Sequence, residues 1–492
     1  MANGNHINPL LHINALPAIA CTFGGNDVYP RRGVTRGVLR ASLLDAPPPH
    51  EAHARLARHF ATTFVLESRD GPDDLARHSV VGWDPVGTVV LEGSRLAVQG
   101  PLPPPGGQAP FDYLRTVLRG LATPAEGPFC GGFVGAAGHA LARTLEPSLE
   151  TGAAETWPRL LLGLYLDALV YDHAAGTCHY VSIGPDRRPD LEALRAPASD
   201  PALRVGALRP TVDESAFVAR VAAAQELVRA GECFQVVLSR AYEGPFEGDL
   251  GACYARLRED ARVPFLFHLR FPGRTLLGAS PERLVAVRGR RAETYPIAGT
   301  RPRTGEPATD AAAAQDLAAD PKENAEHAML VDLARNDLAR VCEPGTVRVE
   351  RFREVQAFRS VLHLVSRVAG ALRPGQDALD ALAALFPAGT VSGAPKVRAL
   401  EHIDRLEARE RGAYAGAVLY LGVDGSLDSA ITLRSLSARH DGGKGALSVQ
   451  AGAGIVLGSR PRAEFQETRH KARAMLEALR PFGASLAGEA WP

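Results

Sequence analysis

Cysteines and lysines are few in this sequence, and neither positive nor negative charge is in excess. Several classes of function can therefore be excluded. The six cysteines are scattered and never form a Cys-x-x-Cys pair, so neither a zinc site nor a disulfide framework is expected. Acidic and basic residues balance at 55 each, which gives no basic footprint for nucleic acid or an anionic membrane. There is no signal-peptide pattern at the start and no apolar run long enough to span a bilayer. We therefore expect a cytoplasmic protein that binds neither nucleic acid nor membrane.

The length and composition are those of a large globular protein. The 492 residues, 46% of them hydrophobic and 22% charged, can form several cores or one two-lobed fold. Residues 1–38 are rich in Asn, Gly, Pro and His without a clear period, and we expect them to form a loose arm. A polar, proline-rich stretch, 185–210, separates an N-terminal region, 39–205, from a C-terminal region, 212–480. We expect both regions to belong to one intertwined fold.

Helices and strands are predicted in an order that does not alternate strictly. We expect helices at 50–59, 213–230, 320–338 and 462–479, and strands at 62–68, 78–85, 160–172, 233–242, 274–277, 283–288, 361–368 and 447–456. Ser215 is the expected N-cap of the second helix, whereas Asp320 and Pro321 mark the start of the third. This mixture favours an α+β fold over a doubly wound parallel sheet.

Two Glu-x-x-Glu pairs occur far apart in the sequence, each within a predicted helix. They are Glu323 with Glu326 and Glu464 with Glu467, and Lys471 follows one turn after the second pair. Residues three or four apart are neighbours on a helix, so each pair presents two carboxylates on one face. Either pair alone is explained as a solvated helix face. If the fold joins them, however, four negative charges call for a hard divalent cation such as Mg²⁺, which suits an anionic substrate.

A set of short segments lies in order between about residues 212 and 480. They are Phe234-Gln-Val-Val-Leu-Ser239, Ala279-Ser-Pro-Glu282, Pro296-Ile-Ala-Gly-Thr-Arg301, Glu326-His-Ala-Met-Leu-Val-Asp-Leu-Ala-Arg-Asn-Asp337, Phe386-Pro-Ala-Gly-Thr-Val-Ser-Gly-Ala-Pro-Lys396, Tyr414-Ala-Gly-Ala-Val418 and Gln450-Ala-Gly-Ala-Gly-Ile-Val456. Together they make the chain similar to the chorismate-utilising enzymes. The chain most resembles anthranilate synthase component I, a group that includes the 2-amino-2-deoxyisochorismate synthases of secondary metabolism. The N-terminal half resembles the same family through Val65-Leu-Glu-Ser68.

The resemblance implies an α/β sandwich of two large antiparallel sheets, with helices outside and a deep central cleft that takes chorismate and Mg²⁺. It also implies roles for residues at the matching positions. Glu326 and Glu467 would contact the metal, supported by Glu323 and Glu464; Arg434 and Tyr414 would hold the enolpyruvyl carboxylate; Thr390, Lys471 and the backbone around Gly452 and Gly454 would hold anionic groups; Glu282 would protonate the departing 4-hydroxyl; and His363 would lie beside the ring. Glu282 can act in this way only if its pKa is raised, which burial would do.

Two positions in this family's site choose among the family's reactions, and Thr300 is a further candidate site residue beside one of them. Where water-adding members carry a base lysine, this chain has Gln235, which cannot deprotonate water. Where aminodeoxychorismate synthases carry a nucleophilic lysine, this chain has Ala298, two residues before Thr300. The remaining candidate nucleophile is ammonia, which would attack carbon C2 of the ring. The product is either 2-amino-2-deoxyisochorismate or, after pyruvate elimination, anthranilate. An aminodeoxychorismate synthase and a non-catalytic binding subunit are the alternatives.

The resemblance also implies a source of ammonia and an effector pocket. The sequence contains no Gly-x-Cys-x-Gly nucleophile motif, so ammonia would come from a separate glutamine amidotransferase subunit or from free ammonium. Whether the chain forms a homo- or hetero-oligomer stays open. Glu67 and Ser68 match the family's tryptophan pocket, but the other motifs of that pocket have changed. We therefore expect weak or no inhibition by tryptophan, which suits a specialised pathway and release of the aminated intermediate. The retained His363 favours elimination instead.

Overall fold

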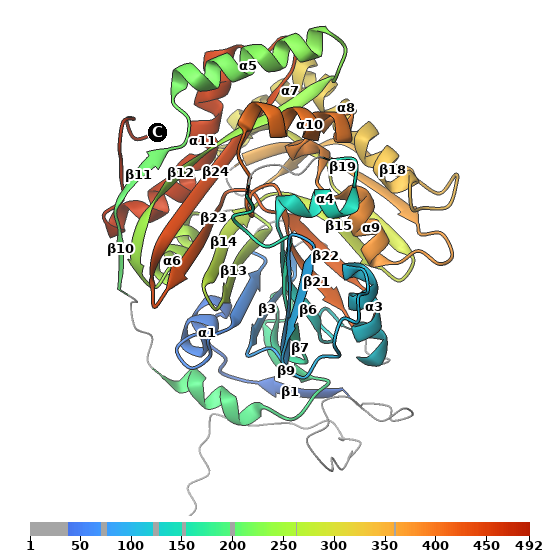
Figure 1. The fold of residues 1–492 in the computed structure, drawn as a ribbon, viewed down its shortest axis with the longest axis vertical. Coiled ribbons are helices and arrows are strands. Elements are labelled where there is room, and N and C mark those ends of the chain that lie inside the picture. Colours follow the sequence, from blue (N-terminus) through green and yellow to red (C-terminus); the bar gives the residue numbers. More distant parts are fainter. Residues whose placement is uncertain are drawn as a thin grey trace, which may run out of the picture.

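Two large sheets with helices on their outer faces make up the protein (Figure 1). The computed structural model describes residues 38–69, 76–121, 127–149, 154–196, 202–261, 263–358 and 361–492, so the expected arm, apart from residue 38, lies outside them. Neighbouring strands are antiparallel except where β11 meets β25. The predicted α+β class, with two large antiparallel sheets, is confirmed.

Within the residues that the structure describes, the first sheet has fourteen strands. In spatial order they are β1 (Leu39–Leu43), β9 (Thr177–Ser182), β8 (Asp167–Asp172), β3 (His78–Trp83), β2 (Thr63–Glu67), β13 (Phe265–Phe271), β14 (Arg274–Ser280), β23 (Ser435–Asp441), β24 (Lys444–Ile455), β12 (Gln235–Gly248), β11 (Ala207–Pro210) and β25 (Ser485–Leu486), while β10 (Leu203–Val205) and β20 (Gly393–Ala394) pair with β12.

The second sheet has eleven strands in the described part of the chain. Their order is β17 (Ile297–Pro302), β19 (Val361–Ala371), β16 (Arg291–Thr294), β15 (Arg283–Arg288), β22 (Leu427–Ile431), β21 (Ala417–Gly422), β6 (Gly132–Ala137), β7 (Leu160–Tyr165), β4 (Gly87–Glu92) and β5 (Arg95–Gln99), while β18 (Arg348–Ala357) pairs with β19. Both sheets join strands from the two regions named in the sequence: β2 pairs with β13, and β6 with β21.

Helices cover the sheets in groups. They are α1 (Pro49–Leu56), α3 (Pro110–Leu121), α4 (Ala142–Leu145), α5 (Glu214–Arg229), α6 (Gly251–Asp260), α7 (Pro307–Ala319), α8 (Pro321–Ala339), α9 (Ala378–Leu385), α10 (Lys396–Glu407) and α11 (Pro461–Leu479), with short 3-10 turns η1 (His139–Leu141), η2 (Arg188–Arg195), η3 (Gly389–Val391) and η4 (Arg480–Phe482). Helices α5, α10 and α11 pack on β12 and β24, whereas α7 and α8 pack on β17 and β19 (Figure 1).

Two local expectations were wrong. The run 160–172, expected to be one strand, is two strands in different sheets, β7 and β8, with Leu166 between them. Nearly every residue of both strands is buried, so their hydrophobicity is continuous and hides the crossing. Helix α5 is capped by Asp213, whose carboxylate accepts a hydrogen bond from Ala216 N at 2.8 Å, rather than by Ser215. A carboxylate two residues earlier offers an equally good cap at the first turn.

The predicted start of α8 is confirmed. The Asp320 carboxylate accepts hydrogen bonds from Lys322 N at 2.9 Å and Glu323 N at 3.2 Å, and Pro321 occupies the first helical position. These bonds satisfy backbone donors that the first turn of a helix leaves without partners. The cap fixes where the helix begins and therefore which face carries Glu323 and Glu326.

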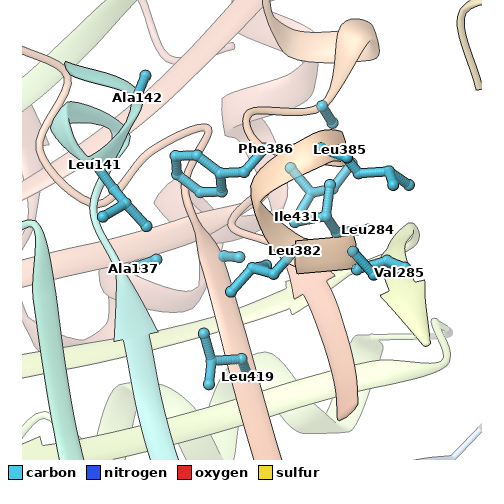
Figure 2. Packing of buried hydrophobic residues seen from close by; sticks show 14 of the residues in the cluster. Ala137, Leu141, Ala142, Leu284, Val285, Leu382, Leu385, Phe386, Leu419 and Ile431 are labelled. Carbon is cyan, nitrogen blue, oxygen red and sulfur yellow. The ribbon is translucent and has the colours of Figure 1, made fainter. Parts of the chain in front are cut away.

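A dense apolar cluster supports the start of β15, directly after Glu282. Figure 2 shows Leu382 and Leu385 of α9, with Phe386, packed against Leu284, Ile431 and their neighbours. Leu284 and Ile431 are 2% and 1% exposed. Replacing a leucine buried in this way by alanine typically costs about 2–5 kcal/mol. The cluster thus holds the backbone that positions Glu282.

Two exclusions from the sequence can be compared with the structure. The five cysteines in the described part of the chain are buried and form no disulfide there. Among the helices of these same residues, none has both the length and the apolar character needed to cross a membrane.

Candidate active site

Glu282 is a buried carboxylic acid held between β14 and β15. It is 8% exposed, and its backbone carbonyl accepts a hydrogen bond from Ile431 N at 3.0 Å. Burial raises the pKa of the Glu282 carboxyl to about 8, against the opposing influence of the Thr390 hydroxyl and of the positive charges of Lys471 and Arg434. The group is therefore protonated at neutral pH, the form that a general acid needs.

Arg434 lies near Glu282 in a constrained backbone conformation. Its φ is +46°, in the left-handed region that residues with a Cβ seldom adopt and that recurs at functional sites. Within the described ranges its guanidinium forms no hydrogen bond or ion pair, although the charge acts on both Glu282 and His363. Burial lowers the pKa of Arg434. A half-buried guanidinium that is not neutralised can bind a planar carboxylate with two hydrogen bonds.

His363 has a fixed orientation on β19. Its Nδ1 lies 2.9 Å from the carbonyl oxygen of Gly299 and 3.2 Å from Thr300 Oγ1. Gly299 is the extra residue of a bulge in β17, between Ala298 and Thr300, and has a φ of +65°. A Cβ on Gly299 would lie 2.7 Å from Leu317 Cδ1 and 3.1 Å from a carboxylate oxygen of Glu323. Only glycine allows the acidic end of α8 to approach so closely.

Tyr414, Gly452 and Lys471 meet on β24. A Cβ on Gly452 would lie 2.7 Å from the Tyr414 hydroxyl, and the Gly452 carbonyl accepts a hydrogen bond from Lys471 Nζ at 3.1 Å. Two residues later, a Cβ on Gly454 would lie 2.5 Å from the side-chain amide nitrogen of Gln235. The small residues of β24 thus let a phenol, an amine and an amide gather on one stretch of backbone.

The structure brings the two acidic pairs together. The pKa of Lys322 is raised by Glu326 and, more weakly, by Glu464, Glu323 and Glu467, so carboxylates from both α8 and α11 surround this lysine. Lys322 Nζ lies 3.6 Å from Glu326 Oε1, and Lys471 Nζ lies 2.7 Å from Glu467 Oε1. Burial, with added repulsion from neighbouring carboxylates, raises the pKa values of Glu323, Glu326 and Glu464.

These carboxylates suit a hard cation, although they are not arranged as a finished metal site. Nowhere in the described ranges do three or more His, Cys, Asp or Glu side chains already surround one metal position. Carboxylates gathered from two helices, three of them with pKa values raised by burial and neighbouring charge, are nevertheless the kind of oxygen donor set that Mg²⁺ uses when a substrate completes its coordination. Glu326 and Glu467 are the two of them placed beside lysines that can move away.

Known proteins supply an independent comparison. Residues 62–477 match the family described as chorismate binding enzyme. The chain belongs to this family. It is 40% identical over 440 residues to anthranilate synthase component 1 of Methanothermobacter thermautotrophicus, with 89% of this chain and 93% of that protein covered. It is 42% identical over 466 residues to the protein of the same name from Streptomyces coelicolor, with 89% and 88% covered.

Two solved structures share this fold. Anthranilate synthase component I from Streptococcus pneumoniae has a TM-score of 0.71 and 34% identity, with 81% of this chain and 92% of that chain covered. The menaquinone-specific isochorismate synthase from Escherichia coli, at 22% identity, shares the fold with a TM-score of 0.67 over 90% of this chain and 95% of its own. The predicted resemblance to the chorismate-utilising enzymes is confirmed.

A cavity lies beside Glu282 and Thr390, and the sequence analysis did not identify the α8 residues that line it. It contains about 360 Å³ of empty space, part of it open to solvent, and the α8 residues Leu330, Leu333, Ala334 and Asp337 line it. Their spacing continues the helix face that begins with Glu323 and Glu326, which was a usable signal. At the far end, Lys396 Nζ lies 2.9 Å from Asp337 Oδ2 and also donates to the carbonyl oxygen of Leu385 at 3.0 Å. Burial raises the pKa of Asp337 and lowers that of Lys396.

Glu67 and Ser68, the residues matched to the effector pocket, lie at the end of β2. The Glu67 side chain is 1% exposed and accepts hydrogen bonds from Arg258 and from the Tyr254 hydroxyl, with closest distances of 2.7 Å and 3.1 Å. Ser68 N donates to Ser79 Oγ at 3.1 Å. Residues of this chain therefore already satisfy the carboxylate that an amino-acid effector would need.

Proposed function

We propose that this chorismate binding enzyme aminates chorismate at C2 with loss of the 4-hydroxyl, in a reaction that depends on Mg²⁺. The observation that carries the proposal is the buried Glu282 carboxyl, with a pKa of about 8, near the unpaired Arg434 and near Lys471, which itself pairs with Glu467 of α11. A neutral acid beside a free guanidinium suits a dicarboxylate whose ring hydroxyl is a poor leaving group. Proteins named anthranilate synthase component 1, at up to 42% identity, support the same substrate class.

In this proposal each side chain has a defined part in the amination. Arg434 and the Tyr414 hydroxyl hold the enolpyruvyl carboxylate, and Lys471 adds positive charge near Gly452. Glu282 transfers its proton to the 4-hydroxyl, which departs as water while the ring double bonds shift and ammonia forms the bond to C2. The proton released from the new ammonium group replaces the one that Glu282 gave, so chorismate and ammonia yield the amino product and water. Bound Mg²⁺ would withdraw electron density through the ring carboxylate, held by Glu326 and Glu467 with Glu323 and Glu464 behind them.

Gln235 and Ala298 support ammonia as the nucleophile. The Gln235 amide lies against Gly454, near Gly452 and Tyr414, and an amide has no basic lone pair with which to activate water. Ala298 pairs with Leu364 in the sheet and offers no nucleophile at all. We infer that ammonia reaches the site from a glutamine amidotransferase subunit, or as free ammonium in its absence.

We further infer that pyruvate elimination follows, giving anthranilate. The Gly299 carbonyl accepts the Nδ1 proton of His363, which leaves Nε2 as the basic nitrogen on a ring whose pKa is lowered by burial. A neutral imidazole with a fixed free lone pair can remove the C2 proton. If this base proves idle, the enzyme releases 2-amino-2-deoxyisochorismate.

A product analysis tests the proposal. The purified chain is incubated with chorismate, Mg²⁺ and ammonium, and the products are separated and identified by mass spectrometry. Anthranilate with pyruvate supports the full reaction, and an amino product that retains the enolpyruvyl group supports amination alone. A 4-amino product would identify an aminodeoxychorismate synthase. Unchanged chorismate, with Mg²⁺ present, would leave only a binding subunit.

A further inference from the structure

A buried ion pair lies behind the substrate-facing residues without being one of them. Glu407, at the end of α10, is 5% exposed, and Arg411, in the loop that follows, is 4% exposed. Arg411 Nη2 lies 2.6 Å from Glu407 Oε1, and Arg411 Nε lies 2.9 Å from Glu407 Oε2. The guanidinium therefore donates a hydrogen bond to each carboxylate oxygen. Such a two-point pair fixes orientation as well as distance.

The remaining donors and acceptors of this pair bind the backbone of two other segments. Arg411 Nη1 donates to Val391 O in η3 at 2.8 Å, and Nη2 donates to Val237 O in β12 at 2.7 Å. Glu407 Oε1 accepts from Ser239 N at 2.7 Å and from Ser239 Oγ at 2.9 Å. One ion pair therefore joins η3, β12 and the end of α10.

Each joined segment carries a residue of the proposed site. Thr390 precedes Val391 in η3, and Gln235 lies two residues before Val237 in β12. Ser239 is paired with Gly452, against which the Tyr414 hydroxyl lies. The Arg411 guanidinium itself is 5.8 Å from the centre of the Tyr414 ring. Displacing Arg411 would therefore move several of the residues that are proposed to contact chorismate.

We propose that Arg411, held by Glu407, is a positioning residue that sets the spacing of Thr390, Gln235 and Tyr414 for chorismate. The inference rests on the proposed function, because chorismate is the ligand it names. A lysine at this position would keep the charge and lose the planar fork, so it could not bind Glu407, Val391 O and Val237 O together. A purely structural pair would affect folding alone.

The test compares three variants of the whole chain. Arg411→Lys removes the fork, and Glu407→Gln keeps the shape and an acceptor oxygen but removes the charge. Arg143→Lys is the control, because the Arg143 side chain is 9% exposed and binds the same helix α10 through Asp404 at 3.1 Å, and in the described part of the chain it has no hydrogen bond to η3 or β12. Chorismate affinity is measured by calorimetry with Mg²⁺ and without ammonium, and the folded fraction by circular dichroism. KM and kcat follow at saturating ammonium.

We expect Arg411→Lys to weaken chorismate binding by about 10-fold or more and to raise KM more than it lowers kcat, with a smaller effect for Glu407→Gln. Arg143→Lys should bind within about 2-fold of the unmodified chain. If Arg411→Lys does not fold, Glu407→Gln decides. Folded variants with unchanged affinity would overturn the inference, as would an equal loss in Arg143→Lys. An unmodified chain that binds chorismate but forms no product would refute the proposed function and leave this comparison intact, whereas one that binds no chorismate would refute both.

Discussion

His363 Nδ1 lies 2.9 Å from the carbonyl oxygen of Gly299, and this contact decides which imidazole nitrogen is basic. A carbonyl can only accept, so Nδ1 carries the proton and Nε2 keeps its lone pair. The bulge at Gly299 that creates the contact also admits the Glu323 carboxylate. The proposed base and the proposed metal side of the site are therefore linked through a single glycine.

Replacing His363 should separate the two halves of the reaction. In His363→Asn the side-chain amide can still donate to Gly299, but nothing replaces the basic Nε2. We expect chorismate consumption to persist while anthranilate formation falls by about 100-fold or more, because general base catalysis contributes on that scale. Mass spectrometry should then find the amino product with its enolpyruvyl group intact. Undiminished anthranilate formation would remove His363 from the elimination step.

The raised pKa of Glu282 predicts the pH dependence of amination. The acid is protonated below about 8, so the rate should fall as pH rises through that value, once it is expressed per concentration of unprotonated ammonia. Glu282→Gln should lose activity by about 10²- to 10⁴-fold. Glu282→Asp keeps a carboxyl and should retain a pH-dependent remnant. A flat profile between pH 7 and 9, with Glu282 intact, would contradict its role as the acid.

The same carboxyl should lower the stability of the protein as the pH rises from 4.5 to about 8. Between the ordinary value of 4.5 and about 8, folded Glu282 keeps a proton that the unfolded chain releases. The folded state binds more protons there, so the free energy of unfolding falls with rising pH, by up to about 1.4 kcal/mol per pH unit from this group. Denaturant titrations at several pH values should show a shallower fall in Glu282→Gln. An identical slope would mean that Glu282 is ionised in the folded protein.

Local signals predicted much of this architecture, and the failures have physical causes. Asp320 and Pro321 correctly predicted the start of α8, because a helix cap depends only on residues within one turn of it. The sheet change at Leu166 left no signal, because strands buried on both faces lack alternation. The role of Arg411 was not predicted, because the groups that the ion pair binds lie far from it in the sequence. Arg411 binds Val391 and Val237, and Glu407 binds Ser239. Motif matching found the groups proposed to touch chorismate, but not those that hold them in place.

Glu467→Gln and Glu326→Gln should weaken Mg²⁺ binding. Each removes one charged oxygen donor from the carboxylates of α8 and α11 that lie near Lys322, and we expect a loss of affinity of about 10- to 100-fold by calorimetry. Turnover should be lost while the circular dichroism spectrum is retained. Glu477→Gln is the matched control on α11, because Glu477 lies at the opposite end of this helix and accepts a hydrogen bond from Trp491 Nε1 at 2.6 Å. Normal Mg²⁺ affinity in both test variants would refute the metal assignment.

Lys322→Gln should have the opposite effect. The charges of Glu326, Glu464, Glu323 and Glu467 act on Lys322, so this lysine would compete with the proposed metal ion for them. Removing its charge leaves the four carboxylates without that counterion, so we expect Mg²⁺ to bind more tightly, by about 2- to 10-fold given the exposure of this lysine. The gain should shrink as the salt concentration rises. Weaker Mg²⁺ binding in this variant would show that Lys322 supports the ion rather than replacing it.

Tryptophan should not inhibit this enzyme at sub-millimolar concentrations. Arg258 and Tyr254 already bind the buried Glu67 carboxylate, so an incoming ammonium group would have to displace a guanidinium at 2.7 Å. Removing one partner of a buried ion pair typically costs about 3–5 kcal/mol, and the 18% exposure of Arg258 points to the lower end of that range. We expect Arg258→Leu to be destabilised by this amount in denaturant titrations, because Glu67 is left charged and buried. The double variant Glu67→Gln/Arg258→Leu should recover much of the loss, because no unpaired charge remains. If Arg258→Leu is as stable as the unmodified chain, or if tryptophan inhibits the unmodified chain at micromolar concentrations, then Arg258 does not close this pocket.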